Sequence, residues 1–237
     1  SGPRGHCSHK TTRACPTRRR PSGRRYNFFA CVNDFRVPKS TPVSLSDRIR
    51  AELTEARAVL DRFLADEANV VRIAQAAEMM ANSLKSGGKI LTCGNGGSAY
   101  TASHYITDWN KMVNLATGKK FRGISLCDNI GLITAFGNDL SYDEVFAGQL
   151  RTILDEGDLL IAVSGSGNSP NVLKAVEYAN ASGAQTLAVA GYDGGKLKQI
   201  AQHCVLIPSF DMQLCEDAHL MFGHMVMKTL CGTSIKH

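Results

Sequence analysis

Residues 159–169 read LLIAVSGSGNS, an apolar run that passes directly into a turn of serine, glycine and asparagine. A helical pattern follows from Pro170. A strand that ends in such residues and then opens a helix presents backbone N–H groups and serine hydroxyls to an anion at the helix N-terminus. The stretch therefore predicts a strand–turn–helix unit of an α/β protein whose turn binds phosphate.

A second turn of the same kind lies about 70 residues earlier, where residues 94–98 read GNGGS after the apolar run 89–93. Neither turn fits the common nucleotide motifs. A P-loop needs a lysine followed by Ser or Thr, and Ala99 and Pro170 stand where a dinucleotide fingerprint places its third glycine. Either turn alone also fits an ordinary connection, but three serine hydroxyls in one turn favour a phosphate site.

The alternation of apolar runs and helical patterns predicts an α/β fold with a mostly parallel five-stranded sheet in three layers, preceded by N-terminal helices. The predicted strands are 89–93, 122–126, 158–163, 185–190 and 203–207. The predicted helices between and after them are about 98–112, 129–137, 142–154, 170–182, 195–201 and 212–232. Ligands of such sheets bind beyond the carboxyl ends of the strands, where both turns lie.

Two amphipathic helices precede the first strand. Apolar residues recur at helical spacing from Leu45 to Leu64, and a second helical stretch runs from about Val70 to Ser86. Neither helix can bury its apolar face alone, so each should pack on the sheet or on another subunit.

The net charge of +6 comes from the N-terminal segment, because residues 1–25 hold eight Arg or Lys and no acidic residue. We assign residues 1–43 to a basic tail, expected to be disordered, and residues 44–237 to the folded domain. The run at Arg18–Arg20 fits a nucleic-acid or anionic-surface arm, but we favour a remnant of expression or an over-long translated start, and expect no nucleic-acid partner.

The eight cysteines form no C-x-x-C pair and lie largely in apolar patterns, which favours buried reduced thiols over disulfides or a zinc ribbon. No apolar run reaches the roughly 18 residues of a membrane span, and no secretory signal is present. We therefore expect a soluble cytoplasmic protein with no membrane partner.

Several titratable residues lie on two predicted helices. The helix after the first turn carries His104 and Asp108 on one face, and the last helix carries Glu216, His219 and His224. Near a phosphate-binding turn such groups suit proton transfer, and they equally suit metal binding; His104 alone also fits a satisfied helix histidine. Glu216 and His224 are about 12 Å apart along a helix, which favours sites assembled between subunits.

The candidate substrate contacts combine the two turns with two other positions. Asp128, after the second strand, fits a contact to sugar hydroxyls, although Asp128 and Asn129 also fit a helix N-cap. The set is Asn95, Gly96, Gly97, Ser98, Asp128, Ser164, Ser166, Asn168, Ser169 and Glu216.

The order and spacing of these motifs resemble the SIS (sugar isomerase) domain family, and in particular its phosphoheptose isomerases, over about residues 45–237. The segments that carry the resemblance are Gly94–Ser98, Gly137–Asp139, Ser164–Val172, Asp193–Lys196 and Glu216–His224. The resemblance implies a flavodoxin-like sheet, a homotetramer with shared active sites, and isomerisation of sedoheptulose 7-phosphate to glycero-manno-heptose 7-phosphate through an enediol.

The resemblance also assigns roles to single residues. It implies Asp108 and His224 as the catalytic pair, and Zn²⁺ as a possible metal held by His104, Asp108, Glu216 and His224. Asp108 stands where the family usually has Glu, and Glu216 where it usually has Gln. These changes, with the basic tail, leave a non-catalytic phosphosugar-binding or assembly protein, of the type that associates with replication initiators, as the alternative. The shared presence of His104, Asp108 and His224 argues for the enzyme.

Overall fold

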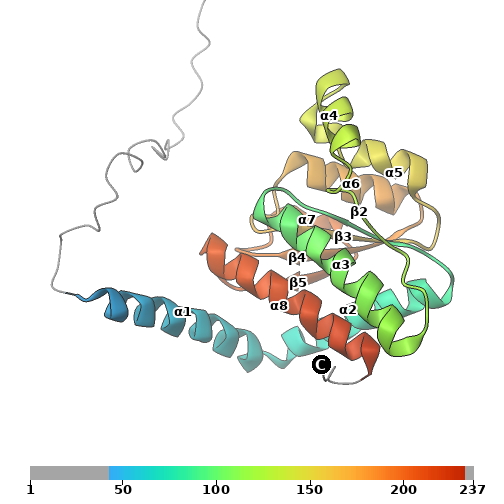
Figure 1. The fold of residues 1–237 in the computed structure, drawn as a ribbon. Helices are drawn as coiled ribbons and strands as arrows, with labels where there is room; N and C mark the ends of the chain where they lie inside the picture. The colour runs from blue at the N-terminus through green and yellow to red at the C-terminus, as the bar shows by residue number, and fades with distance from the viewer. Residues whose placement is uncertain (1–42, 233–237) are drawn as a thin grey trace, which may run out of the picture. The chain divides into compact units, whose positions relative to one another are not determined.

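The structure, a computed structural model, describes residues 43–232, and the predicted basic tail lies outside this range apart from Val43. Figure 1 shows the order of the elements. The helices are α1 (Leu45–Ala65), α2 (Glu67–Lys85), α3 (Gly97–Thr117), α4 (Ile130–Asp139), α5 (Ala147–Ile153), α6 (Pro170–Ala181), α7 (Leu197–Ile200) and α8 (Met212–Cys231), with a 3₁₀ turn η2 (Tyr142–Glu144). The strands are β1 (Ile90–Cys93), β2 (Gly123–Ser125), β3 (Leu159–Ser164), β4 (Gln185–Ala190) and β5 (His203–Leu206).

The five strands form one parallel sheet in the order β2-β1-β3-β4-β5. The prediction of a parallel five-stranded α/β sheet is therefore confirmed. Because all strands run the same way, the turns after β1 and β3, which are neighbours, emerge at the same edge of the sheet. This topology places the two predicted phosphate turns side by side.

Alternating side chains of each strand enter two separate core layers. Ile90 and Leu159 face the layer that α2, α3 and α8 cover, whereas Leu91 and Leu160 face the layer under α5, α6 and α7 (Figure 1). Both faces of the sheet are therefore buried under helices. This explains why the strands read as continuous apolar runs rather than as alternating patterns.

The helix boundaries differ from the predicted ones where caps and buried residues set them. Asp66 accepts a hydrogen bond from Ala68 N, so α2 begins earlier than predicted. Gly118 ends α3 in the left-handed conformation, five residues later than predicted. The predicted helix 142–154 is interrupted at two residues, Val145 and Phe146, whose side chains are buried in the core.

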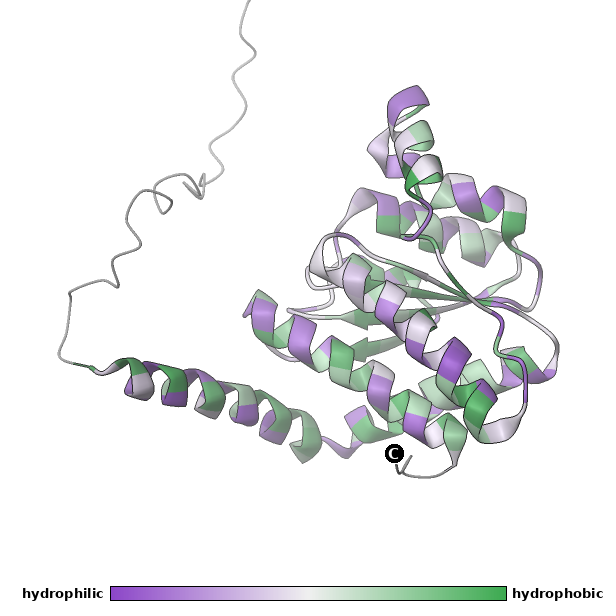
Figure 2. Ribbon diagram, viewed as in Figure 1, coloured by the Kyte–Doolittle hydropathy of each residue, from purple (hydrophilic) through white to green (hydrophobic). Residues whose placement is uncertain are grey.

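Much of α1 has no packing partner among residues 43–232. Only Val59 and Phe63 of this helix are buried. Leu45, Ile49 and Leu53 are 59%, 62% and 67% exposed, and they form an apolar stripe along its first turns (Figure 2). The stripe is the part of the predicted leading helices that the sheet does not cover.

The five cysteines in the described range are unpaired thiols, and Cys93, Cys215 and Cys231 are buried. Burial raises the pKa of the Cys127 thiol to about 11, so this side chain is neutral at physiological pH. None of the helices in the described range is long and apolar enough to cross a bilayer.

Candidate functional site

A crevice of about 260 Å³ lies at the carboxyl ends of β1 and β3. It contains all of the predicted substrate contacts except Asp128 and Asn168. Its lining residues are Asn95, Gly96, Gly97, Ser98, Ser164, Gly165, Ser166, Ser169, Met212 and Glu216.

The turn after β3 holds its serine hydroxyls in a fixed arrangement. Ser164 Oγ accepts a hydrogen bond from Gly167 N at 3.1 Å, and Ser166 Oγ accepts one from Asn168 N at 3.3 Å. Ser169 begins α6 without a side-chain cap bond. Among the described residues no acceptor takes these three hydroxyl protons, so each can be donated to a bound anion.

Close packing of the neighbouring loop explains the glycine in this turn. Gly167 has a φ of +63°, and a Cβ at this residue would lie 2.1 Å from Gly194 O. Asn168 is turned toward the same loop, where its Oδ1 accepts from Lys196 N and its Nδ2 donates to Ser166 O. Asn168 therefore supports the turn rather than lining the crevice, in contrast to our prediction.

The turn after β1 is joined to α6 by a pair of amides. Asn95 and Asn171 donate to each other's side-chain oxygens at 2.8 and 2.9 Å, and the Tyr142 hydroxyl donates to Asn95 Oδ1 at 3.0 Å. Sequence reasoning did not assign a role to Asn171 or Tyr142. The sequence signal that could have identified Asn171 is its position directly after Pro170, the residue that opens α6.

Glu216 reaches from α8 to the N-terminus of α3. A Cβ on Gly97 would lie 2.4 Å from the Glu216 carboxylate oxygens, so glycine is what permits this approach. A carboxylate is favourable at a helix N-terminus because of the partial positive charge there. Glu216 therefore lines the crevice, and it does not join the metal-ligating group predicted for it.

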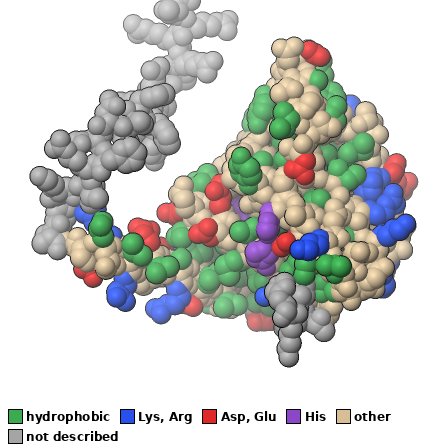
Figure 3. Space-filling model, viewed as in Figure 1, with side chains coloured by type: hydrophobic (Ala, Val, Ile, Leu, Met, Phe, Trp, Pro, Cys, Tyr) green, Lys and Arg blue, Asp and Glu red, His purple; other side chains and the backbone are tan. Residues whose placement is uncertain are grey.

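Three other predicted residues converge next to one another on α3 and α8. His104 Nε2 lies 3.0 Å from His224 Nε2, and Asp108 Oδ2 lies 3.3 and 3.4 Å from these two nitrogens. The three side chains are partly exposed, and histidines form a surface patch where α3 and α8 meet (Figure 3). We call this group the His–Asp–His cluster.

Aromatic packing fixes the two helices that carry the cluster. Trp109 Nε1 donates to Gly223 O at 3.0 Å, and the Tyr105 ring packs where a side chain on Gly223 would have to lie. The Tyr105 and Trp109 rings stack with centroids 4.8 Å apart. This contact holds His104, one residue before Tyr105, against His224, one residue after Gly223.

The donor set and spacing of the cluster fit a zinc ion. Two imidazoles and a carboxylate are ordinary zinc ligands, and ligands about 2.1 Å from a tetrahedral ion lie about 3.4 Å from each other. The three separations observed match this value to within a few tenths of an ångström. Three protein ligands leave a fourth position open, as in catalytic zinc sites.

Asp128 lies away from the crevice, in a hollow beside β2 that Ile106 and Ser125 also line. It accepts a hydrogen bond from Ser103 Oγ at 2.5 Å. The N-cap of α4 is its neighbour Asn129, whose side chain accepts from Leu132 N. The alternative interpretation of this pair as a helix cap therefore applies to Asn129.

His219 lies on α8 but within the core. It is fully buried, and neither ring nitrogen has a hydrogen-bond partner in the described part of the chain. Burial lowers the pKa of His219 to about 4, and the nearby Ala190 carbonyl offsets only part of this effect. The ring is therefore neutral at physiological pH, and it takes no part in the His–Asp–His cluster.

A parallel sheet with a serine-lined crevice at its strand ends and a histidine–carboxylate cluster on α3 and α8 defines an α/β protein with a site suited to phosphorylated ligands. The chain matches the SIS domain over residues 53–191. It is 38% identical to the phosphoheptose isomerase of Vibrio cholerae over 185 residues, covering 78% of this chain and 96% of that one. The solved phosphoheptose isomerase structure from Neisseria gonorrhoeae has a TM-score of 0.74 at 30% identity, covering 80% of this chain and all of that one. The structure from Francisella tularensis has a TM-score of 0.72 at 28% identity, covering 79% of this chain and 98% of that one. The chain belongs to the SIS domain family, in the group that includes the phosphoheptose isomerases.

Proposed function

We propose that this protein is a phosphoheptose isomerase, which converts sedoheptulose 7-phosphate into glycero-manno-heptose 7-phosphate. The observation that carries the proposal is the presence of both parts of the required chemistry in one fold. A crevice offers hydroxyl donors to a phosphate group, and the cluster on α3 and α8 offers imidazole and carboxylate groups that can accept and donate protons. The relatives named above have the same assignment.

The phosphate group should bind at the turn after β3. Ser164, Ser166 and Ser169 have hydroxyl protons to donate there, and the N-terminus of α6 faces the same place. At the other turn the Glu216 carboxylate already lies against Gly97 and would repel a phosphate. The turn after β1 and Glu216 are therefore placed to bind the sugar hydroxyls.

The reaction moves one proton between neighbouring carbons through an enediol. A base removes a proton from C1 of the ketose, and the same proton or one from solvent is delivered to C2, while a second group moves the proton on the oxygens. Asp108 and His224 are the candidates for these two roles. Asp108 Oδ2 lies 3.3 and 3.4 Å from the two imidazole nitrogens, so the carboxylate and the imidazoles are close enough to act in one step.

His104, Asp108 and His224 would hold a zinc ion. When bound, zinc supplies a Lewis acid that polarises the substrate carbonyl and stabilises negative charge on the enediolate oxygens. Glu216 lies outside the His–Asp–His cluster of its own chain, so we propose it as a substrate contact rather than as a fourth ligand of that ion.

We further propose a homotetramer whose active sites are shared between subunits. The exposed apolar stripe Leu45, Ile49 and Leu53 on α1 needs a partner, because exposed apolar surface of this kind favours association. The crevice volume of about 260 Å³ is also slightly below the ordinary range for ligand sites. A cytoplasmic location, where thiols stay reduced, remains part of the proposal.

The test is an isomerase assay of the purified full chain in D₂O with sedoheptulose 7-phosphate and a panel of other ketose phosphates. An enediol route with solvent exchange places deuterium at C2 of the aldose, which NMR detects. The Asp108→Asn variant should lose both turnover and exchange. Absence of turnover on every ketose phosphate, with the phosphate still bound, would instead identify a non-catalytic phosphosugar-binding protein.

A further inference from the structure

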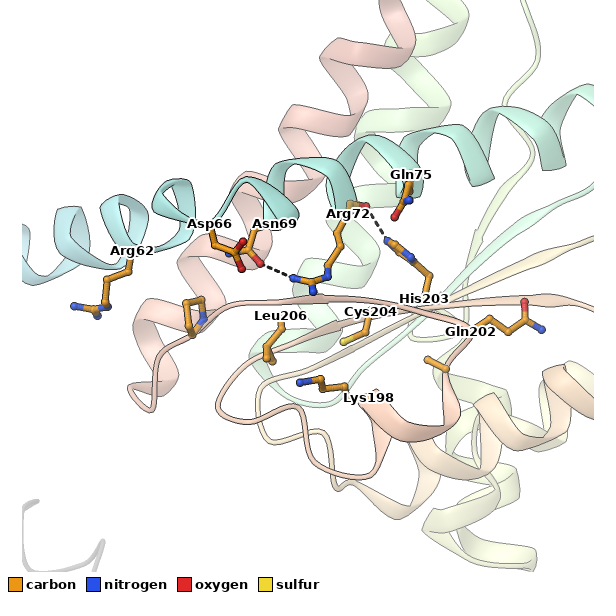
Figure 4. Close-up of a pocket in the computed structure, with 12 residues that line it drawn as sticks. Arg62, Asp66, Asn69, Arg72, Gln75, Lys198, Gln202, His203, Cys204 and Leu206 are labelled. Atoms are coloured by element: carbon orange, nitrogen blue, oxygen red, sulfur yellow. Dashed lines mark hydrogen bonds between the residues drawn. The ribbon is translucent and has the colours of Figure 1, made fainter.

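A second pocket, with a volume of about 550 Å³, lies along β5 and shares no lining residue with the crevice. It runs between α2 on one side of the strand and α7 on the other (Figure 4). Its lining residues are Arg62, Asp66, Asn69, Arg72, Gln75, Lys198, Ala201, Gln202, His203, Cys204, Leu206 and Pro208. We call it the β5 pocket.

The open edge of the sheet supplies backbone groups to the β5 pocket. β5 is the last strand in the sheet order. Ile207 N donates to Ala190 O, so in a parallel ladder the alternate residues Cys204 and Leu206 turn their N–H and C=O groups away from β4. Both residues line the pocket, which therefore contains backbone donors that no strand in the described part of the chain uses.

Three cationic side chains from three helices surround this edge. Arg72 is held by a hydrogen bond to Asn69 Oδ1 at 2.9 Å, and its backbone carbonyl bonds the His203 ring at 2.8 Å. Figure 4 shows Arg72 and Lys198 on opposite sides of β5, with Arg62 further along the pocket. The three positive charges therefore act on one space.

The negative charge in the pocket is smaller than the positive charge. Asp66 is the one carboxylate among the lining residues, and its side chain caps the N-terminus of α2. Arg62 pairs with Glu55 at 3.0 Å, whereas Arg72 and Lys198 form no ion pair with any residue of the described range. Burial raises the pKa of the Cys204 thiol to about 11, although Lys198 and Arg72 oppose this shift, so the thiol stays uncharged.

We propose that the β5 pocket binds a small molecule that carries a phosphate or diphosphate group, separately from the substrate crevice. Arg72 and Lys198 supply unneutralised positive charge, and the two outward N–H groups supply hydrogen bonds to anionic oxygens. The amides of Gln75 and Gln202 and the outward carbonyls suit a polar body attached to that group. The volume lies within the range of small-molecule sites.

The dimensions of the edge argue against an added peptide strand. Strand addition needs a run of free backbone groups, and β5 presents only Cys204 and Leu206 outward over its four residues. The helices on both sides also enclose the strand. A compact anion satisfies the charges of the pocket without requiring a longer edge.

The test is calorimetric titration of the full-length protein with inorganic pyrophosphate. All measurements use Ser166→Ala/Ser169→Ala as background, to weaken binding at the crevice. In that background, Arg72→Gln/Lys198→Gln should lower the affinity for pyrophosphate at least about tenfold, since two charge-assisted contacts are lost. The matched control, Lys119→Gln/Lys120→Gln, removes the same charge from exposed positions outside the pocket and should change affinity less than about twofold.

Equal affinities for the pocket variant and the lysine control would overturn the proposal, as would a background protein that binds no pyrophosphate at about 1 mM. Circular dichroism establishes that each variant is folded. If the double variant does not fold, the single variant Lys198→Gln is measured instead, because this side chain is exposed and forms no ion pair in the described range. A fall of about threefold or more in the affinity for pyrophosphate supports the site, and a smaller change refutes it. Activity of the isomerase crevice does not enter either readout.

Discussion

His104 Nε2 lies 3.0 Å from His224 Nε2, although 120 residues of sequence separate the two side chains. Two neutral imidazoles at this distance form one hydrogen bond, in which one ring donates and the other accepts. The Asp108 carboxylate adds negative charge 3.3 Å from the first nitrogen. A cation shared by all three groups satisfies the two nitrogens and the carboxylate together. The contact between His104 and His224 is therefore the observation that most directly indicates a metal site.

Metal binding should depend on both histidines of the cluster. We expect wild-type protein to bind zinc with one ion per chain, and His224→Ala to lower the affinity by about 100-fold or more, because loss of one of three ligands leaves a site that water must complete. Cobalt substitution provides a readout independent of activity, since tetrahedral Co²⁺ has a strong visible absorption that the variant should lack.

His203→Ala is the matched control for that measurement, because it removes a partly buried histidine that lies outside the cluster. Its metal content and cobalt spectrum should equal those of wild type. A His224→Ala protein that keeps wild-type zinc content would show that the cluster is not a metal site, and the histidines would then act only in proton transfer.

Ser166→Ala should weaken substrate binding more than it slows the chemical step. The phosphate group does not change during the reaction, so a contact to it contributes equally in the ground and transition states. We expect KM to rise about tenfold, the value of one charge-assisted hydrogen bond, with kcat nearly unchanged. Ser182→Ala, at the C-terminal end of α6, serves as the control and should leave both constants unaltered.

An unchanged KM in Ser166→Ala would remove the turn after β3 from the binding site. Steady-state kinetics on sedoheptulose 7-phosphate distinguishes this from a fall in kcat alone. The latter would mean that the hydroxyl acts on the reacting end of the sugar.

His219 should make stability depend on pH. Its pKa is about 4 in the folded protein, against 6.5 for an ordinary histidine. Above about pH 6.5 both the folded and the unfolded chain are neutral at this residue, so its contribution to stability is complete. As the pH falls from about 6.5 to 4, only the unfolded chain takes up a proton, and about 3 kcal/mol of stability is lost across this window.

Urea unfolding at about pH 7.5 and about pH 5 measures this loss. Wild type should lose about 2 kcal/mol more than His219→Leu between these conditions, because the variant has no group to protonate while every other titrating residue is shared. At the higher pH the variant should be at least as stable, since it buries no unpaired ring nitrogen. Identical pH dependence in the two proteins would show that the buried ring finds a partner, such as an internal water.

The sheet was predictable because its signal is local. Each strand is a short apolar run that ends in polar residues or glycine, and the strand positions agree with the structure to within one residue at every boundary. Helix ends depend on tertiary packing and were less accurate. The predicted helix 142–154 breaks where Val145 and Phe146 enter the core, and no local pattern distinguishes this burial from an uninterrupted helix.

The site was predictable in its residue types but not in the direction of each side chain. The turn residues lie at strand ends, so topology alone brings them together. Asp128 also follows a strand, yet a hydrogen bond from Ser103 holds it outside the crevice. Glu216 and His224 share a helix but reach different places, because they lie eight residues apart and the lack of a side chain on Gly97 leaves room for Glu216 in the crevice.

Asp108 and His224 should act as partners in one proton-transfer step. His224→Ala and Asp108→Asn should each lower kcat by about 100-fold or more, the ordinary scale for general acid–base groups. The double variant should be far less impaired than the product of the two effects, because groups that act in the same step are not additive. A fully multiplicative loss would place the two residues in separate steps.

Asp108→Glu is the most revealing change, because the resemblance to the phosphoheptose isomerases implies glutamate at this position. Aspartate is one methylene shorter than glutamate, and a displacement of about 1 Å at a reacting group costs on the order of 100-fold in rate. If the backbone of α3 has not compensated, Asp108→Glu should raise turnover of sedoheptulose 7-phosphate; if it has, the longer side chain should crowd His104 and His224 and lower turnover. Asp61→Glu, on the exposed surface of α1 where the side chain is 70% exposed, controls for the added methylene and should change nothing. If Asp108→Glu has no effect and His224→Ala keeps full native activity, neither residue belongs to the catalytic pair. Proton transfer then depends on other groups around the crevice, and Glu216 is the carboxylate that lines it.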